Sequence, residues 1–306
     1  MSWPVIYRTL HYNPTIVPES HLATIFPFYI HLGPYTLHPH FFFEALSYVI
    51  AFSIYLVLRL RFGDPLITPL RWAVVATTVA GGALGAKLLF WLEDPQLTRQ
   101  HLHDPSYFLG GKTIVGALAF SLVSVELFKR YIGLRGSTGD LYAISLALGI
   151  AIGRIGCFLT GLSDNTYGTP TTLPWAVNFG DGIPRHPTQL YEIAFLLLLI
   201  PILYRVLNRI ALQNRPVILS EVPARSKDPY PLNEPVPTRF LPGDAFKLFM
   251  VAYMSFRLLC DFIKPYPRIF LGLGGIQWAC VLILLYYSRD VARWLRPAPR
   301  IADAYS

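Results

Sequence analysis

Three basic side chains lie inside runs of sequence that are otherwise apolar: Lys87, Arg154 and Arg257. A formal charge is costly in hydrocarbon, so a charge within such a run is a hypothesis for a functional site. With a rise of about 1.5 Å per helical residue, all three are predicted to lie roughly 8–11 Å below the same membrane surface. Each could reach that surface on its own by extending its side chain. Their shared depth instead favours one polar cavity that accepts an anion, and a phospholipid headgroup is the obvious anion there.

Carboxylates are predicted in the same layer of the membrane. Glu44 begins the first apolar run, Glu192 begins the fifth, and Asp261 ends the sixth. Tyr253, Arg257 and Asp261 are spaced four residues apart, so they share one face of a helix. Two interpretations are open for Asp261, which either neutralises Arg257 alone or contacts a ligand beside it.

A second group of reactive side chains lies where a polar loop meets the fifth apolar run. Its members are Arg185, His186, Gln189, Tyr191 and Glu192. A proline is normal in the first turn of a helix, which explains Pro187 but not its neighbours. Histidine is the side chain most easily poised to accept a proton near neutral pH, so His186 is a candidate base or substrate contact. His38 and His40, just before the first run, are weaker candidates.

The three cysteines, Cys157, Cys260 and Cys280, all fall inside apolar runs, and no disulfide is predicted. A buried thiol among apolar neighbours is usually inert, so Cys157 is interpreted as structural rather than nucleophilic. The sequence lacks the phosphate loop ending in Gly-Lys-Ser and the His-Glu-x-x-His pair. It therefore predicts neither a cofactor nor a metal site.

The elements that must position these side chains are membrane helices. The chain has 306 residues, of which 53% are hydrophobic and 14% charged, and this composition predicts an all-α integral membrane protein. Seven runs approach the length that crosses about 30 Å of hydrocarbon. They lie near residues 41–60, 72–92, 113–131, 140–161, 189–207, 245–263 and 272–288.

Lysine and arginine concentrate in alternate loops between these runs, which predicts the N-terminus outside and the C-terminus inside. The net charge of +8 therefore reflects membrane topology, and no nucleic-acid partner is predicted. The expected parts are an interfacial segment 1–40, spans in 41–207 with an outer loop 162–188, a Pro-rich cytoplasmic linker 208–243, spans in 244–288 and a basic tail 289–306.

Two strings of sequence resemble those of the bacterial prolipoprotein diacylglyceryl transferase family. They are Gly153-Arg154-Ile155-Gly156-x-Phe158 and Arg185-His186-Pro187-Thr188-Gln189-Leu190-Tyr191-Glu192. The similarity extends to Gly110-Gly111, to Tyr253-x-x-Phe256-Arg257-x-x-x-Asp261 and to Gln277. It covers most of residues 30–288.

This resemblance implies a transferase of the bacterial inner membrane that acts at the outer leaflet. Such an enzyme moves the diacylglyceryl group of phosphatidylglycerol to the lipobox cysteine in the signal peptide of a prolipoprotein and releases glycerol phosphate. Arg154 and Arg257 match the family's essential arginines and would bind the phosphate. His186 could take the thiol proton. Lys87, Tyr253, His40, Gly153 and Gly156 are expected to line the substrate site with the residues named above.

The sequence departs from the family pattern at several positions. Cys157 stands for an asparagine, Val115 for a histidine and His40 for a tyrosine, while Asp164 or Asn165 is the nearest substitute for a missing glutamate. The outer loop between the fourth and fifth runs is also shorter. The lipid-phosphate side is thus kept and the acceptor side altered, which leaves two alternatives: transfer to a different acceptor, and lipid binding or translocation without catalysis.

Overall fold

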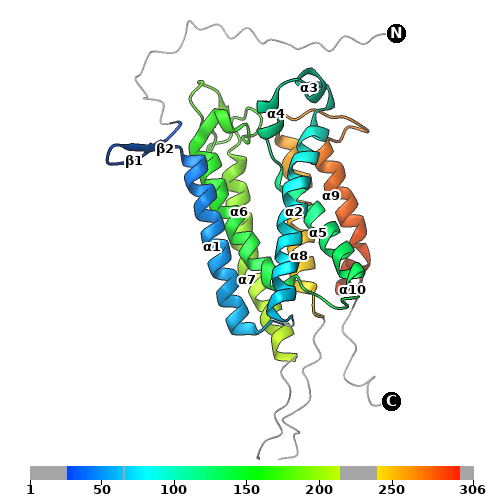
Figure 1. Cartoon of the computed structure of the whole chain (residues 1–306). Coiled ribbons are helices and arrows are strands. Elements are labelled where there is room, and N and C mark those ends of the chain that lie inside the picture. The colour runs from blue at the N-terminus through cyan, green and yellow to red at the C-terminus, as the bar shows by residue number, and fades with distance from the viewer. Residues whose placement is uncertain (1–25, 65, 214–239, 297–306) are drawn as a thin grey trace, which may run out of the picture.

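The computed structural model describes residues 26–64, 66–213 and 240–296, which form a bundle of helices along a common axis (Figure 1). The long helices are α1 (Pro39–Phe62), α2 (Thr68–Glu93), α5 (Ile114–Tyr131), α6 (Asp140–Thr160), α7 (Thr188–Gln213), α8 (Asp244–Cys260) and α9 (Gly275–Tyr286). Of these, α1, α2, α6 and α7 are long and apolar enough to cross a membrane, and α9 is a shorter apolar helix. The protein is therefore a predominantly α-helical membrane protein, as the composition predicts.

Short elements gather at the end of the bundle that is uppermost in Figure 1, here called the upper end. They are β1 (Ile30–Leu32), β2 (Tyr35–Leu37), α3 (Pro95–Gln100), α4 (Pro105–Leu109), η1 (Gly161–Asp164), β3 (Val177–Asn178), β4 (Pro184–Arg185) and η2 (Asp261–Ile263). Hydropathy does not predict them because they are too short to show a period. The side chains of Asp94 and Asp104 cap α3 and α4 by accepting backbone N–H groups. One further short helix, α10 (Ser288–Leu295), lies at the opposite, lower end.

Glycines allow close approach of neighbouring helices. α6 packs between α1 and α7, and α2 packs on α5. A Cβ atom on Gly149 would lie 3.0 Å from Ala51 Cβ of α1, and one on Gly156 would lie 2.8 Å from Phe43 Cβ. The small residues of α6 are therefore packing positions, which seat the first turns of α1 against the end of α6.

The helices differ from the predicted runs mainly at their ends. α7 continues to Gln213, into the segment predicted as a linker, because apolar side chains such as Ile210 still pack on the core. α9 begins at Gly275 rather than 272, because Phe270 and Leu273 form a β-bridge around a turn with Gly272 at φ +73°. The rest of the predicted interfacial segment (1–25), linker (214–239) and tail (297–306) lies outside the described residues.

A carboxylate at the lower end joins two helices that are far apart in sequence. Asp140, the first residue of α6, accepts the backbone N–H groups of Gly243 at 2.5 Å, Ala245 at 3.1 Å and Phe246 at 3.2 Å. These groups belong to the first turn of α8, where N–H groups have no partner within the helix. The contact fixes the position of α8 along α6.

Candidate functional site

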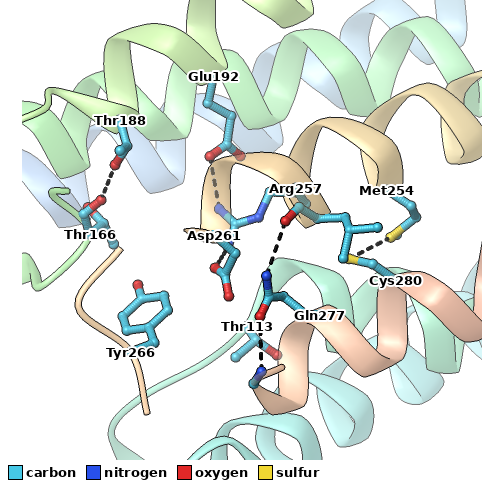
Figure 2. Close-up of polar contacts among 12 residues, drawn as sticks. Thr113, Thr166, Thr188, Glu192, Met254, Arg257, Asp261, Tyr266, Gln277 and Cys280 are labelled. Carbon is cyan, nitrogen blue, oxygen red and sulfur yellow. Dashed lines mark hydrogen bonds and ion pairs between the residues drawn. The ribbon is translucent and has the colours of Figure 1, made fainter. Parts of the chain in front are cut away.

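The carboxylate of Glu192 is the centre of a buried polar cluster near the upper end. Arg154 Nε lies 2.9 Å from Glu192 Oε2, and Arg257 Nη1 lies 3.2 Å from the same oxygen. The hydroxyl of Tyr253 donates to Oε1 at 2.7 Å. Figure 2 shows Glu192 of α7 pointing at Arg257 of α8. Two of the three predicted intramembrane cations thus converge on one acid from a third helix.

Two of the three helices present their charge where the helix dipole favours it. Glu192 is the fifth residue of α7, close to the positive N-terminal end, and Arg257 is the fourth residue from the negative C-terminal end of α8. Arg154 lies in the last third of α6. All three side chains are buried, with Glu192 only 1% exposed. Buried charges require partners, and the three satisfy this requirement mainly with one another.

Asp261 lies on the other side of the Arg257 guanidinium (Figure 2). Its Oδ1 is 3.6 Å from Arg257 Nη2, which is an ion pair but longer than a hydrogen bond. Among the described residues, neither carboxylate oxygen of Asp261 has a hydrogen-bond partner, and the same holds for Arg257 Nε. Unsatisfied buried polar atoms of this kind mark positions that water or ligand atoms complete.

Lys264 is a further cation of this cluster, and the sequence analysis missed it. It is 3% exposed, and its ammonium lies 5.4 Å from the centre of the Tyr266 ring. Within the described part of the chain that ammonium has no hydrogen bond and no ion pair. Burial, and then the positive charges of Arg257 and Arg154, lower the pKa of Lys264 to about 7. Its position three residues after Asp261 is the available signal, but Lys264 lies between the predicted runs 245–263 and 272–288 and so carries no hydropathy signal.

Lys87 does not join this cluster, although its depth predicted that it would. Its ammonium donates to the backbone carbonyl oxygens of Leu109, Gly110 and Gly111, the last at 2.9 Å. Among the described residues it contacts neither arginine. Lys87 therefore holds the turn that leads from α4 to α5.

The side chains of His186, Tyr191 and Trp175 form a separate hydrogen-bonded group at the start of α7. His186 Nδ1 lies 3.2 Å from the hydroxyl oxygen of Tyr191, and that oxygen also accepts the indole N–H of Trp175 at 2.7 Å. Trp175 is 56% exposed and His186 is half-buried. This group is therefore accessible from outside the protein, and none of its three side chains contacts Arg154 or Arg257.

The two other polar residues predicted at this helix start have structural partners. Arg185 pairs with Asp181 at 2.6 Å and stacks 5.0 Å from the centre of the Tyr167 ring. Gln189 donates its side-chain N–H to Thr166 Oγ1 at 3.1 Å, and its Oε1 has no hydrogen-bond partner among the described residues. Gln189 therefore has a free acceptor, whereas the charge of Arg185 is already compensated.

Three of the positions that the sequence resemblance marks as departures meet where α1 adjoins the end of α6. His40 Nδ1 lies 2.7 Å from Asp164 Oδ1, and Cys157 Sγ lies 3.7 Å from Arg154 Nη1. Gly156 allows this approach, since a Cβ there would lie 3.3 Å from His40 Cα. A Cβ on Gly153 would lie 3.9 Å from Ser47 Oγ. Val115, the fourth departure, is a buried core residue.

Comparison with known proteins decides the family. Residues 62–220, just over half of the chain, match the prolipoprotein diacylglyceryl transferase family. The chain belongs to the prolipoprotein diacylglyceryl transferase family. The resemblance read from the sequence is thereby confirmed. Arg154, Glu192 and His186 lie within the matched residues, while Arg257 and Lys264 lie beyond them.

Individual relatives match over a longer stretch. A phosphatidylglycerol–prolipoprotein diacylglyceryl transferase of Polynucleobacter asymbioticus is 29% identical over 283 residues, which covers 85% of this chain and 92% of that protein. Proteins of the same name from Bordetella parapertussis (28% identity, 85% and 91% coverage) and Nitrosomonas europaea (27%, 86% and 89%) are similar. The chain is thus comparable in length to these transferases.

Proposed function

We propose that this protein transfers the diacylglyceryl group of phosphatidylglycerol to the lipobox cysteine of a prolipoprotein. The observation that carries the proposal is the convergence of two buried arginines from separate helices on Glu192, with Lys264 adjacent. The family and the names of the relatives support the same reaction.

In this reaction the thiol sulfur attacks the glycerol carbon that bears the phosphate ester. A C–S bond forms while the C–O bond to phosphate breaks, and glycerol phosphate leaves with the bonding electrons. Negative charge grows on the leaving oxygens. Arg154, Arg257 and Lys264 would stabilise that charge, because preorganised cations in a dry site act more strongly than in water.

Glu192 and Asp261 would set the strength and orientation of this site. Glu192 would hold both guanidinium groups in the site, so that they do not turn toward solvent before the lipid binds. Asp261 has two oxygens that accept no hydrogen bond among the described residues, so it would accept hydroxyl groups of the glycerol headgroup. His186 would take the proton of the acceptor thiol, and Tyr191 and Gln189 would position the acceptor peptide.

The proposal includes the orientation of the bundle. Basic residues such as Arg59, Arg61, Lys129 and Arg130 lie in the last turns of α1 and α5, at the lower end. A cytoplasmic lower end agrees with the positive-inside rule. We therefore propose seven spans with the N-terminus outside, residues 208–243 and 289–306 in the cytoplasm, and the site open to the outer leaflet of a bacterial inner membrane.

Complementation of a bacterial strain depleted of its own diacylglyceryl transferase tests the function. Expression of the full chain is expected to restore lipoprotein processing and growth. Failure at normal expression would remove the lipoprotein assignment. A missing lipid in a deletion strain would then indicate another acceptor, and lipid binding without release of glycerol phosphate would indicate a non-catalytic protein.

Binding of phosphatidylglycerol is expected to tighten as the pH falls through about 7, where Lys264 gains its proton. Between pH 8 and pH 6 the charged fraction rises from about one-tenth to about nine-tenths, so affinity should rise roughly tenfold. The phosphodiester keeps one negative charge throughout this range. Titration of the lipid into protein in nanodiscs of neutral lipid, followed by native mass spectrometry, measures the effect.

Two variants separate the charge of Lys264 from its packing. Lys264→Met should bind weakly with little dependence on pH, and Lys264→Arg should bind tightly with equally little dependence. A Lys264→Met variant with the pH dependence of the wild type would show that another group titrates.

A further inference from the structure

Three side chains where α1 adjoins the end of α6 form one cluster of metal-ligand types. His40 comes from α1, Cys157 from α6 and Asp164 from η1. One potential ligand atom of each lies within 4.8 Å of those of the other two. Cys157 and Asp164 are close in sequence, but His40 comes from a different helix far earlier in the chain, so no short spacing motif could reveal the cluster.

Each of the three side chains also contacts a second polar group outside the cluster. His40 directs Nδ1 toward Asp164, and its Nε2 lies 3.5 Å from the Glu44 carboxylate. The other oxygen of Asp164 accepts the hydroxyl of Thr166 at 2.5 Å. Arg154 Nη1 donates to the thiol sulfur of Cys157 at 3.7 Å. Outer partners of this kind, above all a carboxylate behind the histidine, are typical of metal sites because they orient the ligands.

We propose that His40, Cys157 and Asp164 bind a divalent transition-metal ion of the zinc class and leave a fourth coordination position open. Thiolate, imidazole and carboxylate are the donors that zinc takes, and three protein ligands with one open position are typical of catalytic zinc. Tetrahedral coordination places ligand atoms about 3.3–3.7 Å apart. On metal binding the pair His40–Asp164, now at 2.7 Å, would open and Cys157 would approach, starting from ligand atoms that already lie within 4.8 Å of one another. The His40 side chain is 27% exposed, so an ion can enter.

The open position suits the thiol of the acceptor cysteine, an extension that rests on the proposed function. A thiol that binds zinc loses its proton more readily, here to His186 as in the reaction above, and remains a nucleophilic thiolate. Because Arg154 contacts both Cys157 and Glu192, that thiolate would lie next to the cations that hold the lipid phosphate. The C–S bond would then form as the C–O bond to phosphate breaks.

Metal content of the purified full chain tests the site itself. After loading with Zn²⁺ and dialysis, the wild type is expected to retain about one equivalent per chain by mass spectrometry of the elements. Loading with Co²⁺ should give a thiolate charge-transfer band in the near ultraviolet. The affinity tag must contain no histidine.

Variants that restore the family's residues keep the fold testable. His40→Tyr and Cys157→Asn should each weaken Zn²⁺ binding roughly 100-fold or more and abolish the cobalt band. Cys280→Ser, which alters a buried thiol outside this cluster, should leave both unchanged. Absence of bound Zn²⁺ and Co²⁺ in the wild type would overturn the proposal, as would full retention in Cys157→Asn.

A transfer assay with zinc-loaded and chelator-treated protein tests whether the metal ion activates the acceptor thiol. Loss of transfer on chelation and recovery with Zn²⁺ would support it, and full activity of the metal-free protein would refute it. If neither form transfers, the proposed function fails while the binding measurements still decide the metal site.

Discussion

Arg154→Ala is expected to lower kcat/KM for diacylglyceryl transfer by roughly 10²–10³-fold, the range found when one preorganised donor to a developing oxyanion is removed. The variant should still fold, because Glu192 keeps its contacts with Arg257 at 3.2 Å and with Tyr253 at 2.7 Å. Release of glycerol phosphate from labelled phosphatidylglycerol in the presence of a lipobox peptide measures the rate.

Arg154→Lys distinguishes geometry from charge. Lysine retains the positive charge but cannot bind Glu192 and a phosphate through one planar fork, so most of the activity should still be lost. Arg61→Ala serves as the matched control, because Arg61 lies in the last turn of α1 at the lower end and should not affect the rate. Near-normal turnover of Arg154→Ala would contradict the role of Arg154 in binding the phosphate.

Glu192→Ala is expected to destabilise the protein by about 3–5 kcal/mol, because it leaves two buried guanidinium groups without their shared counter-ion. The carboxylate is 1% exposed, so water cannot replace it without a rearrangement of α6 and α8. Reversible unfolding in mixed micelles, monitored by the fluorescence of the native tryptophans, measures the loss. Transfer activity should disappear in the same variant.

A double-mutant cycle tests whether this destabilisation arises from unpaired charge. The double variant Glu192→Ala with Arg154→Met should be more stable than Glu192→Ala alone, because one uncompensated cation has been removed. Glu126→Ala is the control, since the side chain of Glu126 is 38% exposed and pairs with Lys129 near the end of α5, so less than about 1 kcal/mol is expected. If the double variant is less stable than Glu192→Ala, the packing of Arg154 matters more than its charge.

Hydropathy was sufficient to predict where the long helices lie, because apolar runs between polar loops have few other solutions in a membrane. The placement of Arg154 and Arg257 inside the bundle also followed from sequence, since each lies within an apolar run and is buried in the structure. The pairing of both arginines with Glu192 could not be predicted from the sequence. Glu192 lies at the centre of the cluster because of the rotation of α7 about its axis, which a sequence without known contacts does not specify.

The positions of Lys87 and Lys264 also depend on contacts that the sequence does not reveal. Depth alone placed Lys87 with the arginines, but its partners are backbone carbonyl groups, which every residue carries and which therefore give no signal in the sequence. Lys264 follows η2 and is buried, in a loop whose Tyr266 hydroxyl donates to the carbonyl of Asn165 at 3.2 Å. A loop that returns into the bundle cannot be distinguished by composition from one that faces water.

The contact of Asp140 with the first turn of α8 has a consequence at the far end of the bundle. Arg154 and Arg257 each lie roughly 20 Å along their helices from this contact, at about 1.5 Å per residue. Sliding of α8 by one turn would carry Arg257 about 5 Å past Arg154 and separate the two charges from their common acid. The distance between the two guanidinium groups is therefore set by a contact at the opposite end of the bundle. A substitution of Asp140 is expected to weaken phosphate binding although it changes neither arginine.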